Sequence, residues 1–102
     1  MSVEQEYVKG QRAEQLLANE IYAECMAKVR QGIHDAWAAS PIRDKEGQNE
    51  LRLMLKLLDD LEANVKSVAN TGKLALRQIE HERTLKQQIK DAARGAVSMI
   101  RG

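Results

Sequence analysis

A Gly-Lys pair at residues 72–73 is the first feature of this sequence that could bind a ligand, because Gly-Lys is part of many phosphate-binding loops. Such a loop follows a strand and has the pattern G-x-x-x-x-G-K-[ST], which requires glycine at residue 67 and a hydroxyl side chain at residue 74. Ser67 and Leu74 occupy those positions, and the residues before them show no strand pattern. We therefore predict that this pair does not bind phosphate.

The two histidines are the next candidates, since imidazole nitrogens are common metal ligands. Helical di-iron sites use Glu-x-x-His pairs, but a glutamine, Gln31 or Gln78, stands three residues before each histidine, His34 and His81. The run HERTL at residues 81–85 also lacks the second histidine of a metalloprotease helix. One cysteine and two histidines are too few for a zinc site of nitrogen and sulfur ligands. The sequence predicts neither a metal site nor a cofactor.

Catalytic pairs of side chains are equally poorly supported. Cys25 lies between apolar residues, and we expect it to be a small buried apolar side chain. His34 and Asp35 are adjacent, as are His81 and its flanking glutamates, and neighbouring residues on a helix do not face each other. No nucleophile with a nearby base can be assembled, so we predict that the protein is not an enzyme.

Basic residues gather in the last third of the chain. Residues 1–72 have a net charge of −3 and residues 73–102 a net charge of +4. A row of basic side chains along a helix could neutralise nucleic-acid phosphates. Three acidic residues interrupt the row in this chain, and no aromatic side chain there could stack on a base. Solvated charge, nucleic-acid contact and an acidic protein or membrane surface remain open for these positions, which are Lys73, Arg77, Arg83, Lys86, Lys90 and Arg94.

The composition points to long helices. Among 102 residues there are three aromatic residues, no Phe, one Pro and 30% charged residues, whereas 43% are hydrophobic. This mixture favours surface-rich helices or coiled coils and a single all-α domain over residues 1–102. The single cysteine favours a reducing compartment such as the cytoplasm. We expect no signal peptide, because the N-terminal residues lack its apolar segment, and no membrane span, because the apolar runs are short.

A first helix is predicted over about residues 3–39. Ser2 and Gln5 form a capping-box pattern at its start, Gly10 weakens its opening turns, and Pro41 ends it near Ala39. From Leu16 onward apolar residues recur at steps of three and four, which draws one stripe along a helix. Trp37 at its end is predicted to pack on Leu51, Met54 or Leu55, with contact to a partner protein as the alternative.

A loop over residues 40–47, with Asp44 as the helix cap, precedes a second helix over about 48–100. Its heptad stripe is Leu51, Met54, Leu58, Leu61, Val65, Val68, Gly72, Ala75 and Ile79, continuing through Glu82 and Lys86 to Ile89, Ala93, Ala96 and Ile100. The spacing does not slip at Gly72, which favours one continuous helix. A helix end at Asn70 or Gly72 is the alternative.

This pattern predicts a long antiparallel helical hairpin with an extended, coiled-coil-like second helix. The first part of the stripe, residues 51–68, is expected to pack on the first helix, which is too short to cover the rest. An apolar stripe left exposed would aggregate, so we expect an oligomer. The predicted oligomer or partner contacts are Gly72, Ala75, Ile79, Ile89, Ala93, Ala96 and Ile100.

Residues 35–76 resemble a group of small helical proteins encoded by tailed bacteriophages and prophages. The resemblance rests on Ala36-Trp37, on Arg43-Asp44 in a short loop and on the run Gly72-Lys73-Leu74-Ala75. It covers about 40% of the chain, residues 35–76. Genes of this group tend to lie among virion assembly and DNA-packaging genes, so the resemblance implies a phage context without a mechanism.

The functional expectation is therefore a non-enzymatic, oligomeric accessory of phage virion assembly or DNA packaging. Its partners would be further copies of itself and other phage virion or packaging proteins, in the cytoplasm of a host bacterium or in the virion. Two alternatives remain. One is a nucleic-acid-binding packaging accessory that uses the basic C-terminal helix, and the other is a small phage inhibitor or adaptor that binds a host protein.

Overall fold

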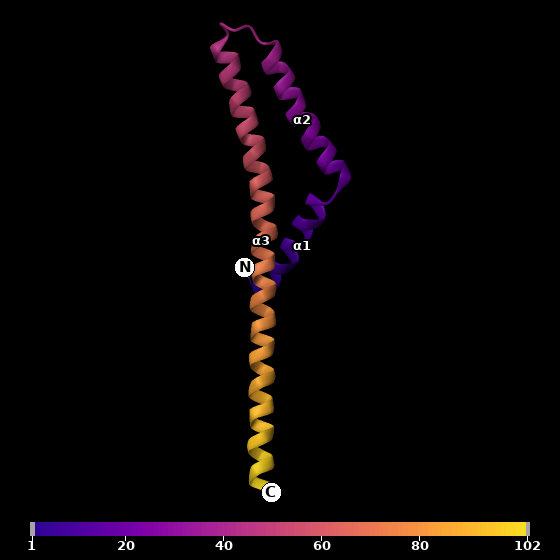
Figure 1. Cartoon of the computed structure of the whole chain (residues 1–102), viewed down its shortest axis with the longest axis vertical. Helices are drawn as coiled ribbons and strands as arrows, with labels where there is room; N and C mark the ends of the chain where they lie inside the picture. The colour runs from indigo at the N-terminus through magenta and orange to yellow at the C-terminus, as the bar shows by residue number, and fades with distance from the viewer. Residues whose placement is uncertain (1, 102) are drawn as a thin grey trace.

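The protein consists of three α-helices, as shown by a computed structural model that describes residues 2–101 and the side chains of residues 2–96. They are α1 (Val3–Leu17), α2 (Glu20–Ala39) and α3 (Lys45–Arg101). The molecule is 89 Å long, and α3 runs along its whole length (Figure 1). The prediction of an all-α fold with a long last helix is confirmed.

Side-chain caps define where each helix begins. Ser2 and Gln5 form the predicted capping box, in which each side chain bonds the other residue's backbone N–H. The Asn19 side chain accepts a hydrogen bond from the Tyr22 N–H at 3.0 Å, and Asp44 accepts one from the Gly47 N–H at 3.0 Å. The Asp44 cap was predicted from the sequence, whereas the Asn19 cap was not.

The single helix predicted over residues 3–39 is wrong, because the chain breaks at Ala18 and Asn19. The Ala18 N–H donates to the Glu14 carbonyl and the Asn19 N–H to the Leu16 carbonyl, which closes α1, and Asn19 adopts an extended backbone that caps α2. The bend lies away from α3, so α1 and α2 approach α3 at different angles (Figure 1). At its other end α2 stops at Ala39, and Ser40 before Pro41 is extended.

The last helix is unbroken through residues 70–73, which excludes the alternative of a helix end at Asn70 or Gly72. It begins at Lys45, three residues before the predicted start at residue 48, because the Asp44 cap lies inside the predicted loop. The connection between α2 and α3 therefore spans residues 40–44 only. Such a short connection turns the chain back on itself, so that α2 and α3 run in opposite directions.

The helices cover only part of α3. Going up the molecule in Figure 1, α1 crosses the middle of α3 and leads away from it to the bend, and α2 then returns toward α3 up to the loop. Below the crossing, residues 80–101 continue as a single helix without an intrachain neighbour; we call them the overhang (Figure 1). Among the residues that the structure describes, no helix is long and apolar enough to cross a membrane.

Candidate protein-interaction surfaces

Two glycines, Gly10 of α1 and Gly72 of α3, meet where these helices cross. A Cβ atom on Gly72 would lie 2.5 Å from the Cα of Gly10, and a Cβ atom on Gly10 would overlap the backbone of Gly72. Neither neighbour is the end of a flexible side chain, so neither could move aside. The backbones of α1 and α3 therefore touch, and both positions require glycine.

Small residues surround this crossing and form the buried part of the protein. Ala13 of α1 and Ala69 and Ala75 of α3 are the buried apolar residues among those the structure describes. At the edge of the crossing, Lys73 forms an ion pair with Glu14 at 3.5 Å. Gly72 and Lys73 form the Gly-Lys pair for which the sequence predicts no phosphate binding. In the structure both residues contact α1.

Contact between α2 and α3 is of a different kind. Arg30 of α2 reaches across to two carboxylates on α3, Asp59 at 2.6 Å and Glu62 at 3.2 Å. The hydrogen bond with Asp59 is the main cause of the raised pKa of Arg30. This pairing was not predicted from the sequence, because Asp59 and Glu62 lie 29 and 32 residues after Arg30 in the chain.

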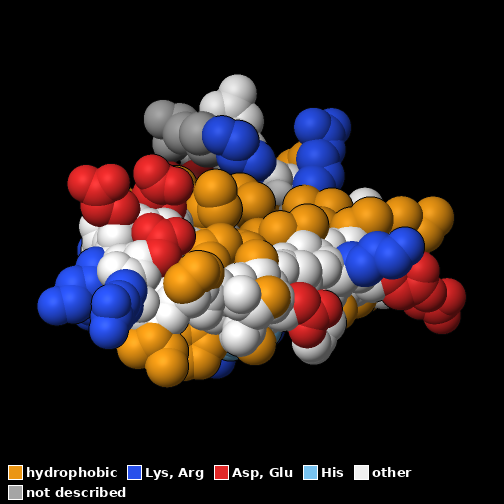
Figure 2. All heavy atoms as spheres, turned by 90° about the horizontal axis from the view of Figure 1, so that it is seen from above, with side chains coloured by type: hydrophobic (Ala, Val, Ile, Leu, Met, Phe, Trp, Pro, Cys, Tyr) orange, Lys and Arg blue, Asp and Glu red, His pale blue; other side chains and the backbone are white. Residues whose placement is uncertain are grey.

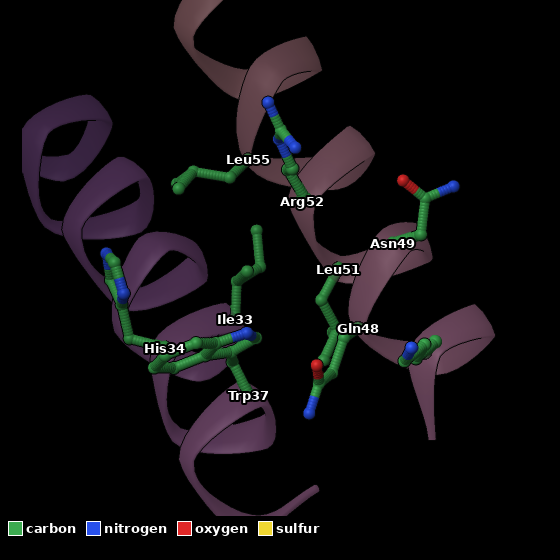
Figure 3. Close-up of a pocket in the computed structure, with 9 residues that line it drawn as sticks. Ile33, His34, Trp37, Gln48, Asn49, Leu51, Arg52 and Leu55 are labelled. Carbon is green, nitrogen blue, oxygen red and sulfur yellow. The ribbon is translucent and has the colours of Figure 1, made fainter. Parts of the chain in front are cut away.

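Between the upper turns of α2 and α3 lies an apolar cleft of about 520 Å³. Ile33 and Trp37 project into it from α2, and Leu51 and Leu55 from α3 (Figure 3). Trp37 lines this cleft beside Leu51 and Leu55 as predicted, but 57% of its surface remains exposed. It therefore closes one side of an open cleft and does not cap a buried core.

The predicted stripe on α3 separates into two seams of side chains. The covered seam comprises the half-buried or buried residues that face α1 and α2, which are Gln48, Leu51, Leu55, Leu58, Glu62, Val65, Ala69, Gly72, Leu76 and Ile79. Met54, Leu61 and Val68 were expected to pack on the first helix and are exposed. They lie one position from members of the covered seam, which places them on the adjacent face of α3.

The second seam, which we call the exposed seam, has its own heptad spacing. It runs through the exposed residues Met54, Leu57, Leu61, Asn64, Val68 and Thr71, is interrupted at the buried Ala75, and continues through the exposed residues Gln78, Glu82, Leu85, Ile89, Ala92 and Ala96. Leu57 and Ile89 are each 68% exposed, although both are large apolar side chains. Seen along the long axis, hydrophobic side chains are visible across the middle of the molecule, between outward-pointing charges (Figure 2).

The predicted oligomer contacts are divided between these surfaces. Gly72 and Ala75 are buried at the crossing with α1, and Ile79 is half-buried on the same side. Their assignment to an intermolecular contact is corrected accordingly, because α1 already occupies that face. Ile89, Ala93 and Ala96 are exposed on the overhang, and the side chain of Ile100 lies outside the described residues.

The basic side chains are likewise divided. Lys73 is paired with Glu14, and Arg77 is exposed beside the crossing. The other four are exposed on the overhang and project from one face at helical spacing; they are Arg83, Lys86, Lys90 and Arg94. This group is a candidate contact for phosphates or for carboxylates.

His, Cys, Asp and Glu are the residues that could bind a metal in the described part of the chain. No three His, Cys, Asp or Glu side chains within it come together as a metal site would require. Cys25 is exposed on α2, which corrects the prediction that it is buried. In the lower half of α2 the predicted stripe is only partly covered: Ile21 and Val29 are exposed, whereas Tyr22 and Met26 are half-buried.

Sequence reasoning missed the Gly10–Gly72 contact and the split of the stripe, although a signal for the first was present. Gly10 lies three residues before Ala13, and Gly72 lies three residues from both Ala69 and Ala75. Small residues at this spacing make one smooth face on each helix, which permits close backbone approach.

Comparison with protein-family models, with curated proteins and with solved structures finds no match to this chain.

Proposed function

We propose that this chain is a non-enzymatic protein that associates with itself through α3 and acts by helix–helix contact in phage virion assembly or DNA packaging. The supporting observation is the exposed seam, which runs from Met54 to Ala96 on a face next to the one that α1 and α2 occupy and is covered only at Ala75, where α1 crosses. A long apolar seam in water is unfavourable by roughly 25 cal/mol per Å² of apolar surface. Covering it with a second α3 removes that cost.

The phage context of this proposal comes from the resemblance of residues 35–76 to small helical phage proteins. Those residues include the loop, Trp37 of the cleft and Gly72 of the crossing. Mass spectrometry of purified virions of a phage that carries this gene tests the context directly. Detection of the chain in virions or in assembly intermediates is expected, and recovery only with a host protein would favour the inhibitor alternative.

Self-association is tested by the mass in solution. Light scattering of the purified chain at micromolar concentration should give at least twice the mass of 11.5 kDa. Leu57→Glu places a charge on the exposed seam and should lower the mass to that of a monomer. Losing about 2 kcal/mol from each of two leucines per dimer weakens the dissociation constant about a thousandfold.

Ala63→Glu is the matched control for this substitution. Ala63 is exposed and lies on the side of α3 opposite to the exposed seam, so the same charge there should leave the mass unchanged. A wild-type chain that stays monomeric would contradict the proposed function. An equal effect of both substitutions would show that the contact does not run through the exposed seam.

A second candidate function, nucleic-acid binding, is favoured by the exposed basic face of the overhang. Duplex DNA should then bind with an affinity that falls steeply with salt concentration. Replacing Arg83, Lys86, Lys90 and Arg94 with Gln should abolish this binding. The matched control replaces four exposed basic residues elsewhere, Lys9, Arg12, Lys28 and Lys56, and equal loss in both variants would argue against a specific face.

A further inference from the structure

The order of residue types along the exposed seam carries information about how two copies would pair. Large apolar side chains occupy its two ends, Met54, Leu57 and Leu61 at one end and Leu85 and Ile89 at the other. Between these ends most positions are polar, namely Asn64, Thr71, Gln78 and Glu82. The seam is therefore similar when followed in either direction.

We propose that two copies pair through their α3 helices in an antiparallel orientation, with Leu57 of one copy opposite Ile89 of the other and Leu61 opposite Leu85. This inference rests on the proposed self-association and specifies its geometry. The two seam positions of each heptad are called a and d. In an antiparallel coiled coil each layer pairs an a residue of one helix with a d residue of the other. The layers that follow are Met54 with Ala92, Leu57 with Ile89, Leu61 with Leu85, Asn64 with Glu82 and Val68 with Gln78.

Neighbouring alignments are less favourable. Sliding one helix by a heptad in one direction places Leu57 opposite Glu82 and Leu61 opposite Gln78. Sliding it the other way places Asn64 opposite Ile89. Each of these layers buries a polar or charged group against an apolar side chain without a partner, which is costly. The chosen alignment instead pairs the large apolar residues Leu57 with Ile89 and Leu61 with Leu85, and it lets Asn64 donate a hydrogen bond to the Glu82 carboxylate of the second copy. Its mixed layers are Val68 with Gln78 and Thr71 with Ala75.

Charge favours the antiparallel over the parallel orientation. Residues 20–66 contain nine acidic and seven basic residues, and residues 80–101 contain three acidic and five basic residues. A parallel pair brings the two basic overhangs together, whereas an antiparallel pair brings each overhang alongside the acidic half of the other copy. Unlike charges at short range favour association and select its orientation.

The shape of the molecule fits this orientation. The overhang extends about 33 Å at 1.5 Å per residue, the same length as residues 45–66 of α3 beside α2. The two-fold axis then falls at residue 73, next to the crossing with α1, where Thr71 of one copy lies opposite Ala75 of the other. Ala75 is buried beside α1 and contributes little new contact. Each overhang thereby gains the neighbour that its own chain does not provide.

Disulfide trapping tests this alignment in the full-length protein. In a Cys25→Ser background, one preparation carries Leu61→Cys and a second carries Leu85→Cys, and the two are mixed under mild oxidation. Because a disulfide requires adjacent Cβ atoms, the mixture should form a mixed dimer about tenfold faster than either preparation alone. Pairing Leu61→Cys with Gln78→Cys, or with Ala92→Cys, supplies the controls displaced by one heptad.

The outcomes separate this inference from the proposed function. If Leu61→Cys alone forms its own disulfide fastest, the helices are parallel and the antiparallel alignment is wrong, while self-association stands. If a displaced control links as fast as the 61/85 mixture, the alignment is wrong. If light scattering shows only monomers before oxidation, the proposed function fails as well.

A charge exchange provides an independent measurement without cysteine. Leu61→Glu and Leu85→Lys should each reduce self-association, because each homodimer contains two layers with an unpartnered charge. When mixed, the antiparallel heterodimer contains one Glu–Lys layer and one Leu–Leu layer, so light scattering should show dimers again. A mixture that remains monomeric would overturn the proposed alignment, since no parallel pairing places residues 61 and 85 together.

Discussion

α1 and α2 both pack on α3, but they do so with different kinds of side chain. At the crossing of α1, glycine and alanine allow the two backbones to touch, and the buried apolar residues of the described chain lie there. Along α2, larger side chains and an Arg30 ion-pair fork hold the helices further apart, and an open cleft remains between them. Small residues therefore give the tighter contact, because dispersion attraction depends on close approach.

The difference also separates the parts of α3 that are covered within one chain from those that are not. The α1 crossing is complete within one chain. The α2 side retains an open cleft with a largely exposed Trp37, and the overhang lacks any neighbour in its own chain. We infer that the crossing holds α1 in place, whereas the two ends of α3 are completed by association.

Placing an alanine at the crossing should have the largest effect on stability. Gly10→Ala would drive a methyl group into the backbone of Gly72, and overpacking of this kind costs about 2 kcal/mol. Gly32→Ala on α2 is the matched control, because its Cβ would meet nothing and alanine favours the helix by up to about 1 kcal/mol. In urea unfolding followed by circular dichroism, Gly10→Ala should lower the free energy of unfolding and Gly32→Ala should raise it. If Gly10→Ala raises it, the backbone contact is refuted.

Loss of the cap between α1 and α2 should have an intermediate effect. Asn19→Ala removes the acceptor of the Tyr22 N–H, which costs about 1 kcal/mol in free energy of unfolding. Asn19→Asp retains an acceptor and should keep most of the stability. If Asn19→Ala is neutral in the same urea assay, the break between the two helices does not depend on this cap.

Removal of the ion-pair fork should have the smallest effect. Arg30→Gln abolishes both ion pairs to Asp59 and Glu62, but exposed pairs contribute little to stability and are screened by salt. A slight decrease of Tm at low ionic strength should vanish in concentrated NaCl. A large decrease that persists at high salt would mean that α2 packs on α3 more tightly than the open cleft indicates.

Much of the fold could be predicted because its signals are local. The capping box at Ser2, the Asp44 cap and the effect of Pro41 act within a few residues. The unbroken spacing around Gly72 correctly favoured one long helix. The break at Asn19 was missed because apolar residues continue at helical spacing on both sides of it, so the pattern conceals a local cap.

The division of α3 into two seams could not be read from periodicity alone. Met54 and Leu55 are similar in size and polarity, yet Leu55 faces the cleft and Met54 is exposed. Which of two neighbouring apolar residues faces α2 depends on where α1 crosses, and the Gly10–Gly72 contact sets that crossing. Arg30 and its partners were missed for the same reason, since they are close only once the helices are placed.

Hydrogen exchange of the overhang tests most directly whether α3 is completed by a second copy. At a concentration where the wild-type chain is associated, backbone amides of residues 80–96 should exchange about as slowly as those of residues 48–79. In Leu57→Glu the protection of residues 80–96 should be lost, while amides around Gly72 stay protected by α1. Overhang amides that exchange equally fast in both proteins would contradict the account.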